Sequence, residues 1–117
     1  MVDTGLGKRL FDFAVNIIKF CRKLPSGKEY QIISNQLIKS STSSGANYEE
    51  AQGAISKPDF FNKINISLKE MRESNYWLRI IKEIQTEDDE IVSLLNESLE
   101  LMKILGSISS KSSKRNN

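Results

Sequence analysis

The sequence contains no histidine, one cysteine and two prolines among its 117 residues. Histidine is the commonest general base and metal ligand, so its absence removes the usual Ser–His and Cys–His nucleophile arrangements. The single thiol, Cys21, has no partner for a disulfide within the chain, and no Cys/His cluster exists to bind zinc. We therefore expect a cytoplasmic chain, in a reducing compartment, without a metal or other cofactor.

Long apolar runs are also missing. No stretch approaches about 18 consecutive apolar residues, so neither a membrane span nor a membrane partner is expected. Residues 1–5 lack the basic region followed by an apolar segment that marks a secretory signal peptide. The glycine-rich loops that bind nucleotide phosphates, G-x-G-x-x-G and G-x-x-x-x-G-K-[S/T], are absent as well.

What the chain does contain is typical of one globular domain, with 38% apolar and 27% charged residues. The net charge is only +2, but it is unevenly distributed. Residues 1–82 carry a net charge of +5, residues 83–105 carry −6 and residues 106–117 carry +3. This distribution indicates one surface that attracts phosphate and another that does not, although ordinary solvated helix faces would give the same counts.

Apolar residues recur at three- and four-residue spacing over four segments, which predicts four helices. The first helix starts near residue 5 and ends at Arg22 or Lys23, because the residue before Pro25 is pushed out of the helical conformation. No alternation of apolar and polar residues bounded by turn residues is present, so strands are not expected.

The other three segments begin with helix-start patterns. Ser26 and Glu29 form a capping-box pattern before the second segment, which continues for about 29 residues. Ser56 precedes Pro58 at the start of the third segment, since serine caps a helix and proline suits its first turn. Thr86 and the acidic residues after it mark the start of the fourth segment.

The middle of the second segment, residues 40–46, is rich in serine and has poor intrinsic helix propensity. A break or kink near Gly45 would explain this composition. A continuous helix with a small-residue surface is the alternative that we favour, because the apolar spacing stays in phase on both sides. Small side chains would then let a neighbouring helix approach closely, while the hydroxyl groups bond to the backbone.

These segments predict an all-α fold. Connections of two to four residues make sequential helices antiparallel neighbours, so we expect an up-down-up-down four-helix bundle. We assign residues 1–108 to this bundle and residues 109–117, which are rich in serine, lysine and asparagine, to a disordered polar and basic tail.

The residues offer little support for catalysis. Glutamate pairs on two long helices are typical of di-metal carboxylate bundles, but those sites also need Glu-x-x-His on two helices. Ser41, Ser43 and Ser44 have no histidine to activate them. Cys21 lies on the apolar line of the first segment, which favours a buried, unreactive thiol. We therefore expect a protein that is not an enzyme and has no catalytic residue or metal site.

Lysine and arginine residues are distributed over the first three segments. Phosphate binding depends on clustered cations and on the release of counterions, so these residues are candidates for a nucleic-acid contact. Arg72 and Arg79 lie about one helical turn from Tyr76. If the Tyr76 ring is exposed, this spacing suits base stacking beside the two cations. If the ring is not exposed, Tyr76 belongs to a core or an interface. The candidates are Lys19, Arg22, Lys23, Lys39, Lys63, Lys69, Arg72 and Arg79.

Two stretches carry a family resemblance. Residues 36–51 contain a small-residue run that leads into Asn-x-x-Glu at Asn47 and Glu50, and residues 57–78 contain Asp-Phe followed by a Ser-Leu-Lys-Glu helix. In this order they resemble the bacterial four-helix bundle family, also called the 23S rRNA intervening sequence protein or S23 ribosomal protein family. The resemblance covers about residues 8–105. It implies an antiparallel four-helix bundle that assembles into a homopentameric barrel.

The resemblance also assigns motif positions. Asn47 and Glu50 match the second-helix motif, although Ala51 stands where many members have glycine. The third-helix matches are Asp59, Phe60, Ser67 and Glu70. We expect Asn47, Glu50 and Glu70 to hold the second and third helices in register through buried or interfacial hydrogen bonds.

Two functions follow as hypotheses. The first is a non-enzymatic oligomeric bundle that binds nucleic acid, either RNA or DNA with RNA favoured, through a basic face with weak sequence specificity. The alternative is a structural or adaptor oligomer with a protein partner and no direct nucleic-acid binding. A reverse transcriptase is one such partner, because a similar accessory protein of diversity-generating retroelements binds one. The self-associating chain is a partner under both hypotheses.

Overall fold

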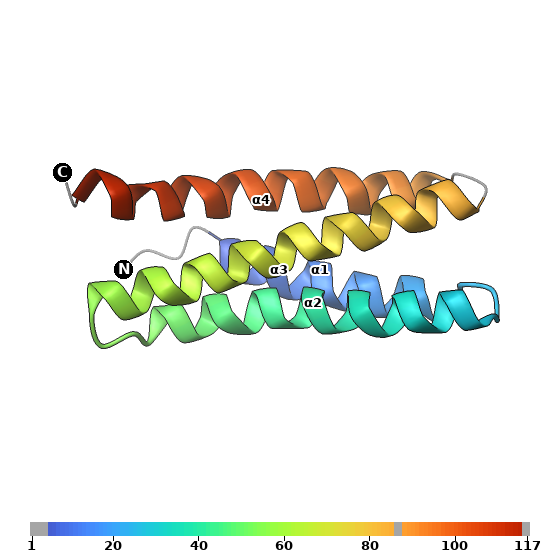
Figure 1. Cartoon of the computed structure of the whole chain (residues 1–117), viewed down its shortest axis with the longest axis horizontal. Helices are drawn as coiled ribbons and strands as arrows, with labels where there is room; N and C mark the ends of the chain where they lie inside the picture. Colours follow the sequence, from blue (N-terminus) through green and yellow to red (C-terminus); the bar gives the residue numbers. More distant parts are fainter. Residues whose placement is uncertain (1–4, 86–87, 116–117) are drawn as a thin grey trace.

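Four helices make up the structure, a computed structural model that describes residues 5–85 and 88–115. They are α1 (Leu6–Cys21), α2 (Lys28–Gln52), α3 (Lys57–Ile84) and α4 (Asp89–Arg115). Sequential helices run antiparallel and form an elongated bundle measuring 48 × 23 × 22 Å (Figure 1). No strand occurs within the described residues. The all-α, four-helix prediction is therefore confirmed.

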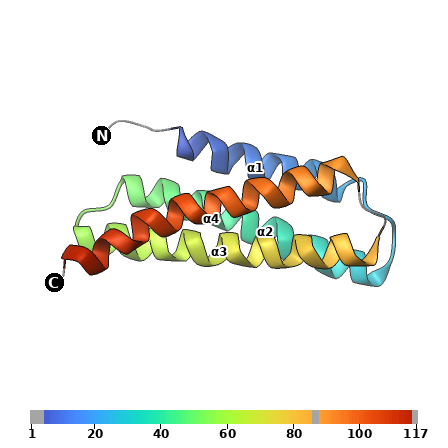
Figure 2. The same cartoon turned by 90° about the horizontal axis from the view of Figure 1, so that it is seen from above.

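The helices pack in a ring in which each contacts its two neighbours in the order α1, α2, α3, α4. The interface between α2 and α3 is the most extensive, and that between α1 and α4 is the smallest. The helix α1 has 16 residues whereas α4 has 27, and the two diverge towards the C-terminal end of α4 (Figure 2). The C-terminal part of α4 consequently packs on α3 alone.

The core is a single cluster of apolar side chains to which all four helices contribute. Phe13 from α1, Leu37 from α2 and Met71 from α3 are among its fully or almost fully buried members. Burying one such side chain contributes roughly 1.5–3 kcal/mol, so the core supplies most of the stability of the bundle. Its other large members are Leu10, Ile17, Ile64, Leu78, Ile81, Ile91, Leu101 and Leu105.

Serine residues replace apolar ones where α2 meets α3. Ser44 Oγ donates to the carbonyl oxygen of Ser67 at 2.8 Å, and Ser67 Oγ donates to the carbonyl oxygen of Ser44 at 2.7 Å. Ser40 lies one helical turn from Ser44, and Ser74 lies two turns from Ser67; the hydroxyl oxygens of Ser40 and Ser74 are 2.7 Å apart. All four residues are buried. Short side chains thus bring the helices together while every hydroxyl keeps a partner, and the continuous α2 confirms the predicted helix through residues 40–46.

The helix starts agree with the sequence in part. Ser56 caps α3 as predicted, accepting a hydrogen bond from the backbone N–H of Asp59 at 3.2 Å. The predicted capping box at Ser26 is wrong: Gly27, with φ of 153°, occupies the N-cap position of α2, and no side chain caps it. The predicted cap Thr86 lies outside the described residues, and Asp88 instead accepts from the backbone N–H of Ile91 at 2.9 Å.

The C-terminal boundary also differs from the prediction. We expected the bundle to end at residue 108, but α4 continues to Arg115, so residues 109–115 are helical rather than a disordered tail. Ser109 donates a hydrogen bond to the side-chain oxygen of Asn65 on α3. Partly buried Ile104 and Ile108 pack against the core. The polar composition of residues 109–115 gave no indication of the hydrogen bond from Ser109 to α3.

The serine contact between α2 and α3 generates a stability prediction. We expect Ser67→Leu to lower the free energy of unfolding by about 1–3 kcal/mol, because extra methylene groups at a fully buried site force the two helices apart. Urea denaturation at fixed chain concentration measures this change. The control Ser93→Leu, at an exposed position on α4, should change stability by no more than about 0.5 kcal/mol. Equal stability of the two variants would contradict the close approach.

Gly45 provides a second prediction. A Cβ atom at this position would lie 3.6 Å from Leu10 Cβ on α1, which is ordinary van der Waals contact. Gly45→Ala should therefore raise the unfolding free energy by roughly 0.5–1 kcal/mol, since alanine favours the helix and meets no clash. Gly106→Ala on α4, where nothing lies within 4 Å, is the matched control and should give a similar gain in thermal unfolding. A loss of stability at Gly45 alone would contradict this spacing.

Candidate nucleic-acid interface

The exposed side of α3 carries the densest group of predicted nucleic-acid contacts. Lys69, Arg72, Tyr76 and Arg79 recur at intervals of three and four residues, so they share one side of the helix. We call these four residues the α3 stripe. All four are exposed. Within the described part of the chain, none of the three cations forms an ion pair with a carboxylate, so their charge is directed to solvent.

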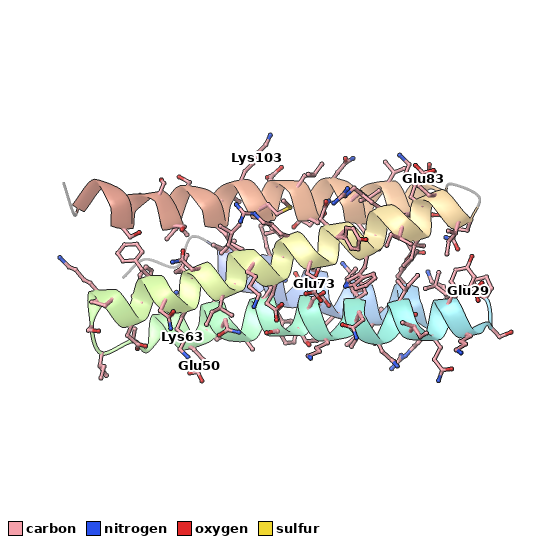
Figure 3. The ribbon with its side chains drawn as sticks, viewed as in Figure 1. Glu29, Glu50, Lys63, Glu73, Glu83 and Lys103 are labelled. Carbon is pink, nitrogen blue, oxygen red and sulfur yellow. The ribbon has the colours of Figure 1, made fainter. Side chains whose placement is uncertain are left out.

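The other candidates lie elsewhere. Lys19, Arg22 and Lys23 are exposed at the C-terminal end of α1, where Lys23 Nζ pairs with Glu90 Oε1 of α4 at 2.7 Å. Lys39 is exposed on α2, and Lys63 is half-buried on α3. Figure 3 shows Lys63 and Glu50 near the end of the bundle where α2 connects to α3. The structure thus brings Lys69, Arg72 and Arg79 together and leaves the remaining candidates in separate places.

Tyr76 and Arg79 form an ordered pair within the stripe. The Arg79 guanidinium carbon lies 5.6 Å from the centroid of the Tyr76 ring, a cation–π arrangement. Arg79 Nε also donates to Asn75 Oδ1 at 3.0 Å, and the buried Asn75 in turn donates from Nδ2 to Ser98 Oγ of α4 at 2.9 Å. The guanidinium is therefore held by a chain of hydrogen bonds that reaches the α3–α4 contact.

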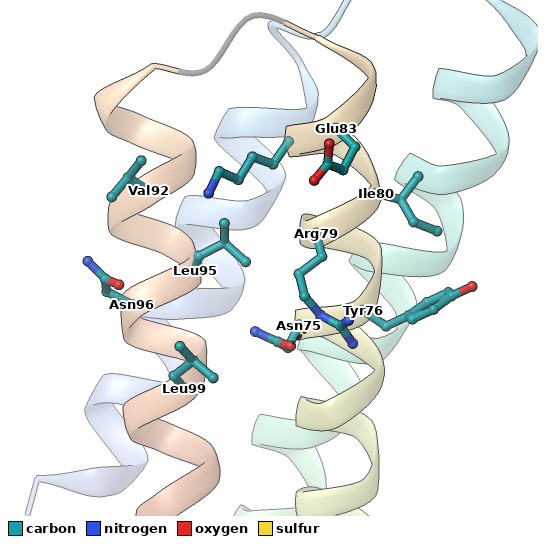
Figure 4. A pocket seen from close by; sticks show the side chains of 10 residues that line it. Asn75, Tyr76, Arg79, Ile80, Glu83, Val92, Leu95, Asn96 and Leu99 are labelled. Carbon is teal, nitrogen blue, oxygen red and sulfur yellow. Dashed lines mark hydrogen bonds between the residues drawn. The ribbon is translucent and has the colours of Figure 1, made fainter.

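A groove between α3 and α4 lies beside this pair (Figure 4). Its volume is about 580 Å³. Val92, Leu95 and Leu99 line the α4 side, and Arg79 crosses its α3 side, with Tyr76 beyond it in the view of Figure 4. Glu83 lies at one end of the groove and is its one carboxylate within the described residues. The groove combines an apolar wall with a positively charged edge.

The side formed by α1 and α4 has the opposite character. Arg9 of α1 bonds Glu97 through two contacts, at 2.6 and 3.1 Å, and approaches Glu100 Oε1 at 3.1 Å. The hydrogen bond to Glu97 raises the pKa of Arg9 above its usual value despite some desolvation. A groove between α1 and α4 is lined by Asp12, Asp89, Glu97 and Glu100, so this side holds three of the seven acidic residues within residues 83–105. Anionic ligands are disfavoured there.

The motif residues do not take the role we expected for them. Asn47 Nδ2 donates to the carbonyl oxygen of Ser43 at 2.9 Å, which is a contact within α2. The exposed side chain of Glu50 makes no hydrogen bond in the described part of the chain, and its carbonyl oxygen accepts from the backbone N–H of Gly53 at 3.1 Å. Glu70 receives a bond only at its backbone oxygen, from Ser74 of its own helix. The prediction that these three side chains bond α2 to α3 is therefore wrong for the single chain.

The remaining motif residues have structural positions. Asp59 and Phe60 lie in the first turn of α3, where Phe60 packs against the core and meets the Phe61 ring edge-on at 5.2 Å between centroids. Ser67 makes the interhelical bonds described above. Trp77 Nε1 donates to Glu73 Oε2 at 3.2 Å, a side-chain contact within α3.

Other chemistry finds little support. Burial raises the pKa of the half-buried Cys21 thiol, partly opposed by a hydrogen bond with Ser34, so the reactive thiolate is disfavoured. No group of three metal-ligating side chains occurs among residues 5–85 and 88–112. In the same part of the chain, no helix has the length and apolarity needed to cross a membrane.

Sequence reasoning missed two elements of this site. Arg9 and its acidic partners are 88 and more residues apart, so their pairing depends on the bundle topology. The α4 wall of the groove does not follow from the sequence, because the spacing of apolar residues does not separate buried Leu101 from exposed Leu99. The Asn75 position on the core line of α3 was a usable signal, because a buried amide requires a partner.

The comparisons with known proteins agree on one family. The family model for the 23S rRNA-intervening sequence protein matches residues 5–107. The chain is similar to a crystal structure of a protein with unknown function from the S23 ribosomal protein family of Bacteroides thetaiotaomicron. That similarity has a TM-score of 0.81 and 36% sequence identity, and it covers 89% of this chain and 97% of that one. No curated protein matches. The chain therefore belongs to the 23S rRNA-intervening sequence protein family.

Proposed function

We propose that the protein is a non-enzymatic homo-oligomer that binds RNA through the α3 stripe, with affinity that depends on salt and little on sequence. The observation that carries this proposal is the set of exposed cations Lys69, Arg72 and Arg79, which have no carboxylate partner in the described residues. Such cations release counterions from the phosphate backbone when they bind it, which drives association without reading bases.

The charge distribution supports this surface over the others. The acidic residues of α4 lie against α1, where Arg9 and Lys23 pair with them. An approaching polyanion is thus repelled from the α1–α4 side and attracted to α3. RNA is favoured over other polyanions because the family is named for sequences that interrupt 23S rRNA.

Assembly into a homopentamer is the second part of the proposal. Phe11 on α1 is 67% exposed, and it lies beside Val15 and Ile18 in an apolar groove between α1 and α2. Two further exposed apolar side chains, Ile32 of α2 and Ile84 of α3, lie at the end of the bundle where α2 begins and α3 ends, and we assign them to a second contact surface. Two different surfaces suit a head-to-tail ring, in which each copy uses one surface towards each neighbour. A ring repeats the α3 stripe in every copy.

The RNA-binding proposal is tested by reversing the stripe. The variant Lys69→Glu/Arg72→Glu/Arg79→Glu should bind a single-stranded RNA oligonucleotide at least about ten-fold more weakly at low salt, because three phosphate contacts become repulsive. Fluorescence anisotropy over a salt series measures the affinity and its salt dependence. The wild-type slope of log affinity against log salt should be steeper than that of the variant, by about 0.7 for each lost phosphate contact.

The matched control is Lys28→Glu/Lys57→Glu/Lys111→Glu, which makes the same change in net charge at exposed positions away from the stripe. It should retain most of the wild-type affinity. Equal losses in the two triple variants would assign the binding to net charge rather than to the stripe. A wild-type protein that does not bind RNA at low salt would overturn the proposal and favour the adaptor function, which a partner protein surviving nuclease treatment would then support.

Assembly is tested separately by size-exclusion chromatography with light scattering. The wild-type protein should have five times the 13.3-kDa mass of the chain. Phe11→Asp should reduce the mass to that of smaller species, because a charge at the centre of the α1–α2 surface cannot be buried without a partner. The control Ile55→Asp, at a 96% exposed loop position, should leave the mass unchanged. A monomeric wild-type protein would overturn this part of the proposal.

A further inference from the structure

The contacts around Tyr76 go beyond what phosphate binding requires. Tyr76 is 49% exposed although it carries a large aromatic group, and the ring of its neighbour Trp77 meets its own ring edge-on at 5.2 Å between centroids. The Arg79 guanidinium lies over the ring at 5.6 Å. A flat aromatic group and a flat cation are thus presented together at the surface, in fixed positions.

Two further contacts fix this arrangement. Arg79 Nε donates a hydrogen bond to Asn75, and the buried Asn75 donates one to Ser98. These bonds restrict the positions that the guanidinium can adopt. Holding it in advance reduces the entropy that a ligand must overcome to order it. The rest of the guanidinium edge remains available to bond a phosphate or a base oxygen.

The adjoining groove supplies the apolar part of a binding site. Leu95, Leu99 and Val92 line the α4 wall, and the volume of about 580 Å³ falls within the range of small-ligand sites, roughly 300–1,000 Å³. Lys82 and Glu83 are adjacent on α3 and both line the groove, so their opposite charges offset each other, and Arg79 supplies the positive charge of the α3 edge.

We infer that Tyr76, Arg79 and the α3–α4 groove form a site for an unpaired nucleotide, and hence that the RNA recognised is single-stranded. The inference rests on the proposed function and specifies its ligand class. An unpaired base stacks on the Arg79 guanidinium, which itself lies over the Tyr76 ring, and contacts the Leu99 side of the groove, while its phosphate is bound by the stripe cations. Bases inside a duplex are already stacked and paired, so they gain nothing from this surface.

The test compares three RNA ligands by fluorescence anisotropy: a single-stranded oligonucleotide, the same strand with abasic sites, and the strand annealed to its complement. The wild-type protein should bind the normal single strand about ten-fold more tightly than the abasic strand, which has the same phosphates but no bases. Tyr76→Ala should remove this preference and lower affinity for the normal strand about ten-fold. Affinity for the abasic strand and the duplex should stay within about two-fold.

Two variants separate stacking from other effects. Tyr76→Phe keeps the ring and should bind the single strand as the wild type does, and equal losses in the Phe and Ala variants would overturn stacking. Ile55→Ala, at an exposed apolar position in the α2–α3 connection, controls for loss of apolar surface and should bind normally. Circular dichroism checks that each variant folds.

The outcomes separate the nucleotide-site inference from the proposal that the α3 stripe binds RNA. If the wild type binds the single, abasic and duplex ligands equally and Tyr76→Ala changes nothing, the nucleotide site is wrong. The proposed function then still stands, provided that the triple glutamate variant of the stripe loses binding. If the wild type binds none of the three ligands, both are overturned.

Discussion

The close contact between α2 and α3 is the constraint on which the rest of the structure depends. Ser44 and Ser67 each donate to the backbone of the other helix, and those bonds exist only at one rotation and one register of α3. With Ser67 and Ser74 directed at α2 and Asn75 directed at α4, positions 69, 72, 76 and 79 must face solvent. The exposed stripe is therefore a consequence of the buried serines.

The same geometry connects the core to the surface through one amide. Asn75 uses its Nδ2 inside the bundle, on Ser98, and its Oδ1 at the surface, on Arg79. A buried amide with both ends bonded is stabilising, whereas an amide that loses either partner carries a desolvation cost of about 1–3 kcal/mol. The position of Arg79 is thus coupled to the packing of α3 on α4, which explains how a surface cation can be ordered without a carboxylate beside it.

The sequence predicts the fold well because its apolar spacing is regular and only two prolines interrupt it. The cap at Ser56 and the continuous helix through residues 40–46 follow from local rules and are confirmed. The errors have local causes as well. Gly27, rather than Ser26, occupies the N-cap position of α2. The polar composition after residue 108 gave no indication that α4 continues beside α3, where Ser109 bonds Asn65. The site is less predictable, since the exposure of Tyr76 and the pairing of Arg9 with Glu97 depend on how four helices close.

The separation of acidic from basic surfaces explains how a chain with a net charge of only +2 can bind a polyanion. Arg9 pairs with Glu97, and Lys23 pairs with Glu90, on the side where α1 faces α4. Because these ion pairs are largely exposed to solvent, each contributes at most about 1 kcal/mol to stability. Their larger effect is on the field around the molecule, since they hold Glu90, Glu97 and Glu100 of α4 on the side that faces α1. A single stripe with three cations gives only weak phosphate binding, because each contact contributes about one released counterion. Repetition of the stripe in an assembly multiplies these contacts along one RNA strand, and the assembly raises the effective concentration of each after the first has bound. Self-association through the apolar surfaces and RNA binding through the basic one are therefore linked: an oligomer is the form in which so modest a positive surface becomes sufficient.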